Sequence, residues 1–319
     1  MSRVRDLLAR FDAYQQRRAV LAVPLAVLRK FSDDGAGNRA ALVAYYGFFS
    51  LFPLLLLFTT ILGFVLAGSP SAQSAVESSV LKQIPIIGAS LKSGSLSGSG
   101  LGLAVGLVGA LLSGMGVTMA LQNAFNTVYA VPQRDRPNYL GARWRSLKLL
   151  FILGVLQLVS TAVAGLVAGG LGGALLTVAG IVVSLLLDFV TFYAVFRLMI
   201  DADVTTRELW PGIAIAAVAW ELLQALGGIY IGHVVKGDKQ TYGTFAVVIG
   251  LLVWIYLGAR VVVYAAEINV VLARRLWPRS LLGGTKEPAD RKALEGLAKI
   301  EERAPGETVE VTFDDDGPD

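Results

Sequence analysis

The sequence predicts an all-α, polytopic membrane protein built as a bundle of six transmembrane helices. Hydrophobic residues make up 55% of its 319 residues and charged residues only 16%, whereas roughly a quarter of a typical soluble domain is charged. Long apolar runs recur along the chain, and a helix needs about 20 such residues to cross the hydrocarbon. Lys and Arg gather in alternate connecting segments, which is typical of a multi-pass membrane protein.

The apolar runs divide the chain into three regions. Residues 1–38 form a basic N-terminal segment, residues 39–277 a six-helix transmembrane domain, and residues 278–319 a charged tail. Glycines at 169, 170, 172 and 173 separate the third span from the fourth. The predicted spans cover about residues 40–67, 101–129, 147–168, 174–199, 209–232 and 242–273.

The two ends of the chain have compositions unlike that of the spans. In the N-terminal segment, apolar residues such as Leu7, Leu8 and Phe11 recur at helical spacing beside arginines. This pattern predicts an amphipathic helix in the membrane interface, with a solvated basic lead-in as the alternative. The tail is punctuated by Gly and Pro and ends in an acidic run, which predicts a disordered, solubilising segment.

The basic residues determine the expected orientation. Of the 28 Lys and Arg residues, 23 lie in the two terminal segments and in the loops after the second and fourth spans. Because such residues are retained in the cytoplasm, both termini are expected there, in a bacterial inner membrane. The basic loops are explained by anionic lipid head groups, and no nucleic-acid partner is expected. The chain contains no cysteine, which excludes disulfides and thiolate metal sites.

Four ionisable residues inside the predicted spans are the main candidate functional residues: Asp188, Glu221, Arg260 and Glu267. A charge within hydrocarbon costs several kcal/mol unless it is paired or hydrated. We expect Arg260 to lie between Asp188 and Glu221 near the membrane midplane. Glu267 lies closer to the cytoplasm, with Arg197 as its expected partner. This intramembrane polar site is interpreted either as a pathway in which one carboxylate changes protonation or as a fixed ion-pair network.

Further polar residues and one proline stand out within the spans. Gln122 and Asn126 share a helix face beside Asn123 and are expected to bond across helices or line a hydrated cavity, and Asn269 is a similar residue in the last span. Pro53 is expected to kink the first span, because it cannot donate a backbone hydrogen bond.

Nothing in the sequence predicts catalysis, a metal site or a cofactor. The only histidine, His233, has no second histidine or cysteine to complete a zinc site or a catalytic triad. The sequence therefore favours a protein that is not an enzyme.

Three segments carry a resemblance to a known family. Residues 44–57 read AYYGFFSLFPLLLL, residues 116–131 read GVTMALQNAFNTVYAV, and residues 242–270 read YGTFAVVIGLLVWIYLGARVVVYAAEINV. Together they resemble the YihY/BrkB family of bacterial inner-membrane proteins, sometimes labelled ribonuclease BN-like. The motif positions are Tyr45, Tyr46, Ser50, Pro53, Asn126, Tyr129, Pro211, Tyr242, Gly243, Trp254, Tyr256, Glu267 and Asn269.

The resemblance implies a six-helix inner-membrane protein linked to envelope integrity, with solute export or lipid movement in some members. Arg260 departs from the family pattern, since an apolar residue is expected there in many members. The leading hypothesis is a transporter-like protein that moves a small solute or a lipid, with membrane lipids as partners. The alternative is a non-transporting scaffold that binds lipids or partner proteins, and an oligomer is left open. Ribonuclease activity is not favoured, because phosphodiester hydrolysis usually needs metal-binding carboxylates or a general base on a hydrated surface.

Overall fold

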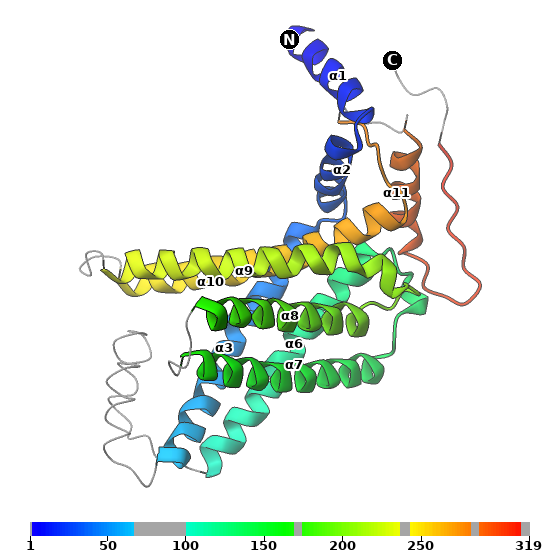
Figure 1. Ribbon diagram of the computed structural model, residues 1–319. Coiled ribbons are helices and arrows are strands. Elements are labelled where there is room, and N and C mark those ends of the chain that lie inside the picture. The colour runs from blue at the N-terminus through cyan, green and yellow to red at the C-terminus, as the bar shows by residue number, and fades with distance from the viewer. Residues whose placement is uncertain (1, 67–99, 169–173, 237–242, 282–286, 314–319) are drawn as a thin grey trace.

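The computed structural model describes residues 2–66, 100–168, 174–236, 243–281 and 287–313, and every regular element in these ranges is a helix (Figure 1). A short 3-10 turn, η1 (Gln133–Asp135), joins two of the long helices. The helices are α1 (Ser2–Gln16), α2 (Ala19–Asp33), α3 (Ala36–Leu66), α6 (Gly100–Val128), α7 (Tyr139–Ala168), α8 (Ala174–Met199), α9 (Thr206–Lys236), α10 (Gly243–Ala273) and α11 (Pro288–Lys299).

The long helices form one bundle, and the short ones stand at one end of it. In Figure 1, α7, α8, α9 and α10 run roughly side by side, and α3 and α6 cross them at an angle. α3 packs against α6, and α10 packs against α9, α3 and α2. The N-terminal helices are therefore attached to the bundle through α2.

Five helices in the described residues are long and apolar enough to cross a membrane: Ala36–Leu57, Gly100–Val128, Val178–Met199, Thr206–Gly227 and Val248–Ala273. α7 is not among the five, although it contains 30 residues. Arg143, Arg145 and Lys148 lie in its first ten residues. The all-helical class and the membrane-spanning character are confirmed, whereas the count of six spans stays a prediction.

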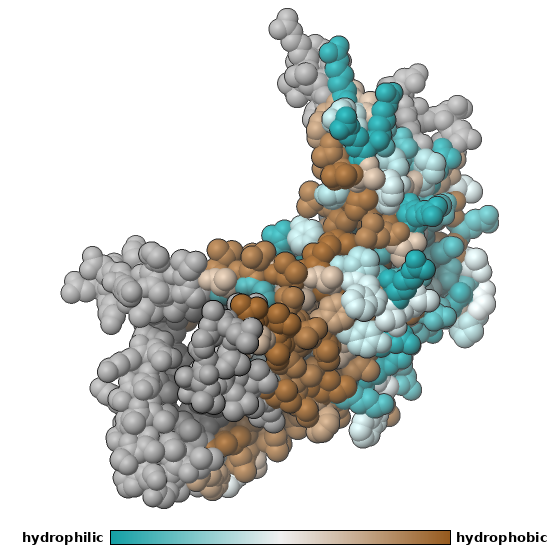
Figure 2. Space-filling view, in the orientation of Figure 1, coloured by the Kyte–Doolittle hydropathy of each residue, from teal (hydrophilic) through white to brown (hydrophobic). Residues whose placement is uncertain are grey.

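The surface of the bundle is apolar where it would meet lipid. Large side chains such as Phe151, Val155 and Phe245 are exposed along the helices. Figure 2 shows a hydrophobic band over the long helices, with hydrophilic residues gathered at the end where α2 and α11 lie. A contiguous apolar surface of this extent is expected in a bilayer and not in water.

Close helix packing depends on small residues. A Cβ atom added at Gly106 would lie 2.9 Å from the backbone nitrogen of Leu57, and one at Gly109 would lie 2.9 Å from Cβ of Pro53. α3 and α6 can approach this closely only because these positions lack side chains. Pro53 lies inside α3, which continues as a helix on both sides of it, and the predicted kink stays a prediction.

Both ends of the chain contain more helix than expected, and the place of the N-terminal segment in the membrane interface stays a prediction. The N-terminal segment forms two helices, and Phe31 of α2 stacks on Tyr264 of α10 with ring centroids 3.9 Å apart. In the tail, residues 288–299 form α11, with Ala289, Asp290 and Ala293 buried. The described part of the tail is thus folded. α11 packs through a narrow face of small residues, which the low overall hydrophobicity of its sequence does not reveal.

Candidate functional site

Three buried charged residues, Lys30, Asp34 and Glu267, lie together and are here called the Lys30 triad. Lys30 Nζ lies 2.5 Å from Asp34 Oδ2 and 3.1 Å from Glu267 Oε2. Glu267 is fully buried, and its Oε1 atom has no hydrogen-bond partner. Burial raises the pKa of Asp34 above its usual value, and attraction to Lys30 only partly opposes this. The triad therefore holds two carboxylates around one ammonium group in a largely buried position.

The triad corrects the expected pairing of Glu267 with Arg197. Arg197 is exposed near the end of α8, and its Nη1 atom reaches the carbonyl of Val204 at 3.5 Å. The partner of Glu267 comes from α2, which packs against α10. The sequence could not indicate this, because α2 reads as an interfacial segment rather than as part of the bundle.

Cations converge on carbonyl groups at the C-terminal end of α6 and in the turn that follows it. Lys30 Nζ donates to Val128 O at 2.9 Å, Arg274 Nη2 to Tyr129 O at 2.6 Å, and Arg136 Nη2 to Val131 O at 3.1 Å. Carbonyls at a helix C-terminus lack intrahelical partners and carry partial negative charge. Burial lowers the pKa of both Arg136 and Arg274. These basic side chains therefore supply hydrogen-bond donors to carbonyl groups at and just after the end of α6.

A second polar cluster surrounds Asp201, just after the end of α8. Gln122 Nε2 and Asn126 Nδ2 donate to Asp201 Oδ2 at 3.0 and 2.7 Å, and Arg145 forms an ion pair with Oδ1. The predicted contact of Gln122 and Asn126 with another segment is present. Sequence reasoning missed Asp201, although an aspartate in a short loop beside an amide pair could have indicated it.

A cavity of about 190 Å³ opens beside this cluster. Gln122, Asn123 and Asn126 line it from α6, and Arg136 and Tyr139 line it from the following segment. Asn126 is almost fully buried, and its Oδ1 atom has no hydrogen-bond partner. A polar molecule in the cavity would therefore face side-chain amide groups and one guanidinium group.

The carboxylate pair, Asp188 and Glu221, lies at the contact between α8 and α9. The two carboxyl groups are within hydrogen-bonding reach of each other, and Ser184 Oγ donates to Glu221 Oε1 at 2.7 Å. Both residues are half-buried. Among the described residues, no Lys or Arg lies within ion-pair distance of either carboxylate.

Arg260 does not join this pair, which corrects the expected arrangement. Its guanidinium carbon lies 5.4 to 5.7 Å from the ring centres of Phe31, Tyr256 and Tyr264, and its Nη2 atom donates to Tyr264 Oη at 3.0 Å. Tyr256 and Tyr264 are one helical turn before and after Arg260, so all three share a face of α10. That face meets α2, which supplies Phe31, and Arg260 is stabilised by aromatic rings there.

Several other predicted residues have structural contacts. Asn269 Oδ1 accepts a hydrogen bond from Gly212 N at 2.7 Å, Ser50 Oγ donates to Gly47 O at 2.7 Å, and Trp254 packs against Gly227. Tyr45 and Tyr46 form an edge-to-face pair. Gly243 begins α10, and Tyr242 lies outside the described residues.

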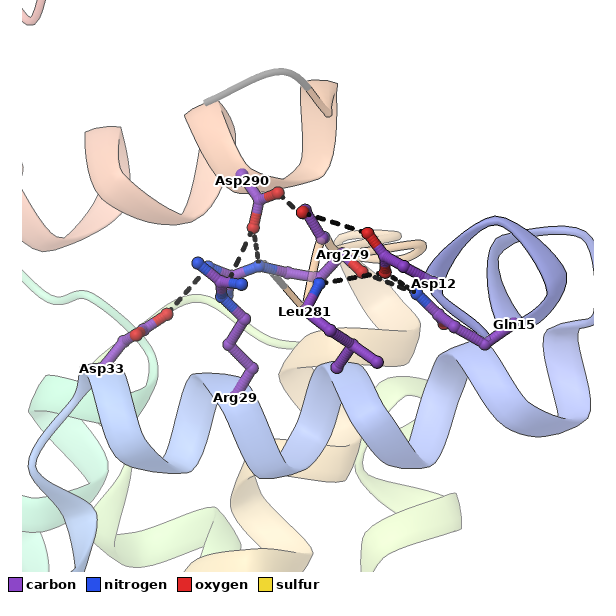
Figure 3. Close-up of polar contacts among 8 residues, drawn as sticks. Asp12, Gln15, Arg29, Asp33, Arg279, Leu281 and Asp290 are labelled. Carbon is purple, nitrogen blue, oxygen red and sulfur yellow. Dashed lines mark hydrogen bonds and ion pairs between the residues drawn. The ribbon is translucent and has the colours of Figure 1, made fainter. Parts of the chain in front are cut away.

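A buried polar network around Arg279 joins both ends of the chain (Figure 3). Arg279 Nε lies 2.5 Å from Asp290 Oδ1 of α11, and its Nη2 atom lies 2.7 Å from Asp33 Oδ2 of α2. Gln15 Nε2 of α1 donates to Arg279 O at 2.8 Å, and Asp12 Oδ1 accepts from Leu281 N at 3.0 Å. This Arg279 network fixes α1, α2 and α11 to one another.

The described residues contain no group of three or more His, Cys, Asp or Glu side chains that could hold a metal ion.

Comparison with known proteins gives a consistent result. Residues 27–289 match the family described as virulence factor BrkB. The chain is 24% identical to the inner membrane protein YhjD of Escherichia coli over 274 residues, covering 79% of this chain and 81% of that protein. It is 22% identical to the ribonuclease-like protein YfkH of Bacillus subtilis over 251 residues, covering 75% of this chain and 90% of that protein.

A third relative is longer. The chain is 25% identical to a UPF0761 membrane protein of Alkalilimnicola ehrlichii over 291 residues, which cover 89% of this chain but 65% of that protein. No solved structure shows significant similarity to the chain.

Proposed function

Because the chain belongs to the BrkB family of membrane proteins, we propose that it is a transporter-like protein that moves a small solute or a lipid through, or along, the bacterial inner membrane. In this proposal the protein supports envelope integrity, and its apolar surface is surrounded by membrane lipids.

The carboxylate pair is the observation that carries the proposal. Asp188 and Glu221 lie within hydrogen-bonding reach of each other on two helices apolar enough to cross a membrane. Two ionised carboxylates at this separation repel each other, and a charge in an apolar environment is costly. The pair is therefore favoured when it binds a proton or another cation. A site that takes up and releases positive charge inside a helix bundle is what ion-coupled transport requires.

The proposal includes six spans, with α7 as the sixth, and both termini in the cytoplasm. The apolar part of α7 after Lys148 contains 20 residues, which is about the length needed to cross hydrocarbon. Reporter proteins fused after Ser93 or Lys236 should lie outside the cytoplasm, and those fused after Arg136, Ala202 or Arg279 inside it. An external signal at Arg279 would contradict the six-span count.

A non-transporting scaffold is the second candidate function, and the Arg279 network favours it. The network joins α1, α2 and α11 through buried, hydrogen-bonded charges. Such a rigid unit at the end of the bundle is suited to holding a partner protein or a lipid head group.

The ribonuclease-like name of one relative is not transferred to this chain. Lys30, Arg136 and Arg274 donate to carbonyls at the end of α6, and Arg279 lies between two carboxylates. These cations face protein groups and are not arranged to follow a nucleic-acid backbone.

The decisive experiment separates transport from scaffolding. Glu221→Gln and Asp188→Asn nearly conserve side-chain shape but remove the titrating charge. Flux of protons and candidate solutes is measured in vesicles containing each variant. In parallel, survival of a deletion strain under envelope stress is normalised to the amount of inserted protein. Asp203→Asn, at an exposed position, is the matched control.

Transport predicts that both pair variants lose most flux and most survival per folded molecule while the control retains them. Wild-type flux and survival for both pair variants would refute the titrating-pathway proposal and favour the scaffold.

A further inference from the structure

The Lys30 triad contains one more carboxylate than ammonium groups. Its three side chains are buried, and the ammonium group of Lys30 lies against both Asp34 and Glu267. A buried charge is tolerated only when its polar atoms have partners. If both carboxylates were ionised, the three side chains taken together would carry one net negative charge.

Glu267 shows where a proton would fit. Its Oε1 atom is buried and has no hydrogen-bond partner, and the carboxyl group of Asp34 lies close to that of Glu267. Two carboxylates cannot hydrogen-bond to each other, because neither has a hydrogen to donate. One proton on either group supplies that hydrogen and also reduces the repulsion between the two groups.

Water can reach the triad from one side. A partly open cavity of about 30 Å³ is lined by Lys30 and Asp34, and by Lys292, Gly296 and Leu297 of α11. A cavity needs roughly 10–15 Å³ to hold a water molecule, provided that it has polar partners. The cavity therefore has room for water between the triad and the outside of the protein, and α11 forms one wall.

We propose that Asp34 and Glu267 together bind one proton, which exchanges with water through the cavity beside α11. On uptake, a hydronium ion gives its proton to a carboxylate oxygen of the pair and leaves as water, and release is the reverse. This site is separate from the carboxylate pair at Asp188 and Glu221, and it does not depend on the proposed transport function.

Charged groups of both signs surround the triad. Attraction to Lys30 favours the ionised form of both carboxylates, whereas burial opposes it and raises the pKa of Asp34. The other titratable groups that face the site are Asp33 of α2, Arg39 of α3, Tyr129 after α6, Glu208 of α9, Arg274 after α10 and Lys292 of α11.

The test is infrared spectroscopy of the purified full-length protein in lipid nanodiscs at neutral pH. A protonated buried carboxyl group gives a carbonyl-stretch band that shifts when water is replaced by D₂O. The measurements are made in the Asp188→Asn, Glu221→Gln background, so that the other carboxylate pair cannot contribute. We expect one carboxyl equivalent, which is lost on adding either Glu267→Gln or Asp34→Asn.

Glu302→Gln is the matched control. Glu302 is also buried, but it pairs with Arg134 at 3.0 Å and accepts a hydrogen bond from Val309 N at 3.1 Å, so both of its carboxylate oxygens have partners. The control should keep the full band. A band that survives both triad variants, or the absence of any band at neutral pH, would overturn the proposal. The same single triad variants in the otherwise natural chain give the comparison if the double background folds poorly.

A substitution at Gly296 tests whether the proton exchanges through the cavity beside α11. A methyl group at Gly296 would lie 3.5 Å from Cβ of Ala130, which is an ordinary contact. Gly296→Ala should keep the fold and narrow the cavity, and we expect the band to exchange with D₂O several-fold more slowly. An unchanged exchange rate would show that the proton does not pass through this cavity.

Discussion

Replacing Gly212 by alanine should strongly destabilise the contact between α9 and α10. The added Cβ atom would lie 2.2 Å from the carbonyl oxygen of Ala265 and 2.6 Å from Asn269 Oδ1, whereas ordinary contacts begin near 3.4 Å. The helices would have to separate by about 1 Å or more at this point. The separation would also weaken the hydrogen bond from Gly212 N to Asn269 Oδ1.

The magnitude follows from three terms. Overpacking costs about 1–3 kcal/mol, and a buried partner left without its hydrogen bond costs about 1–3 kcal/mol. Against these losses, the higher helix propensity of alanine relative to glycine stabilises the folded state by about 1 kcal/mol. The expected net loss is about 3 kcal/mol in the free energy of unfolding.

The assay is unfolding in mixed detergent micelles, with thermal stability followed by size-exclusion chromatography. Gly154→Ala in α7 is the matched control, because no atom of the described residues beyond its own stretch of helix lies within 4 Å of the Cβ it would add. The control should unfold like the natural protein or be more stable by up to about 1 kcal/mol. If Gly212→Ala were as stable as the control, the packing argument would be wrong.

Two further predictions concern the buried charges. Burial raises the pKa of Asp34 in the folded protein. The protonated Asp34 side chain therefore contributes its full stabilisation below its unfolded pKa of about 3.9. This contribution is lost as the pH rises through the higher pKa of the folded state. The free energy of unfolding should therefore fall as the pH rises over this window, and it should fall less in Asp34→Asn. Parallel pH profiles of unfolding for the two proteins would contradict this expectation. Arg279→Leu should leave the buried Asp290 carboxylate with only the more distant cation of Arg29, at 3.7 Å, and cost about 3 kcal/mol. The variant should also increase proteolysis near α11, with the exposed Arg303→Leu as control. Adding Asp290→Asn should recover part of the loss, and unchanged proteolysis of Arg279→Leu would exclude the role of Arg279 in holding α11.

The sequence was a good guide to elements whose formation depends on local composition. Apolar runs of about 20 residues form helices in a bilayer, since a backbone without water must satisfy its own hydrogen bonds. The positions of α3, α6, α8, α9 and α10 therefore followed from hydropathy. The same logic selected the rare polar residues, and Glu267, Gln122 and Asn126 all form buried contacts with other segments.

Local composition was a poor guide to the ends of the chain. α11 has low overall hydrophobicity, yet Ala289 and Ala293 pack on one face and Asp290 is buried against Arg279. A short helix with a narrow apolar face reads like a solvated tail. Its order depends on contacts with α2, with Arg279 and with the turn after α6, none of which the tail sequence of α11 reveals.

What the sequence by itself determined is the membrane class, the long apolar helices and the set of candidate polar residues. What only the tertiary structure decided is which polar and charged side chains meet. Lys30 pairs with Glu267, Arg279 with Asp33, and Gln122 with Asp201, each across a long stretch of chain. Helical periodicity fixes which residues share a face, but the rotation of each helix and its neighbours depend on packing of the whole bundle. Arg260 shows the consequence, because its face of α10 met the aromatic rings beside α2 and not the carboxylate pair.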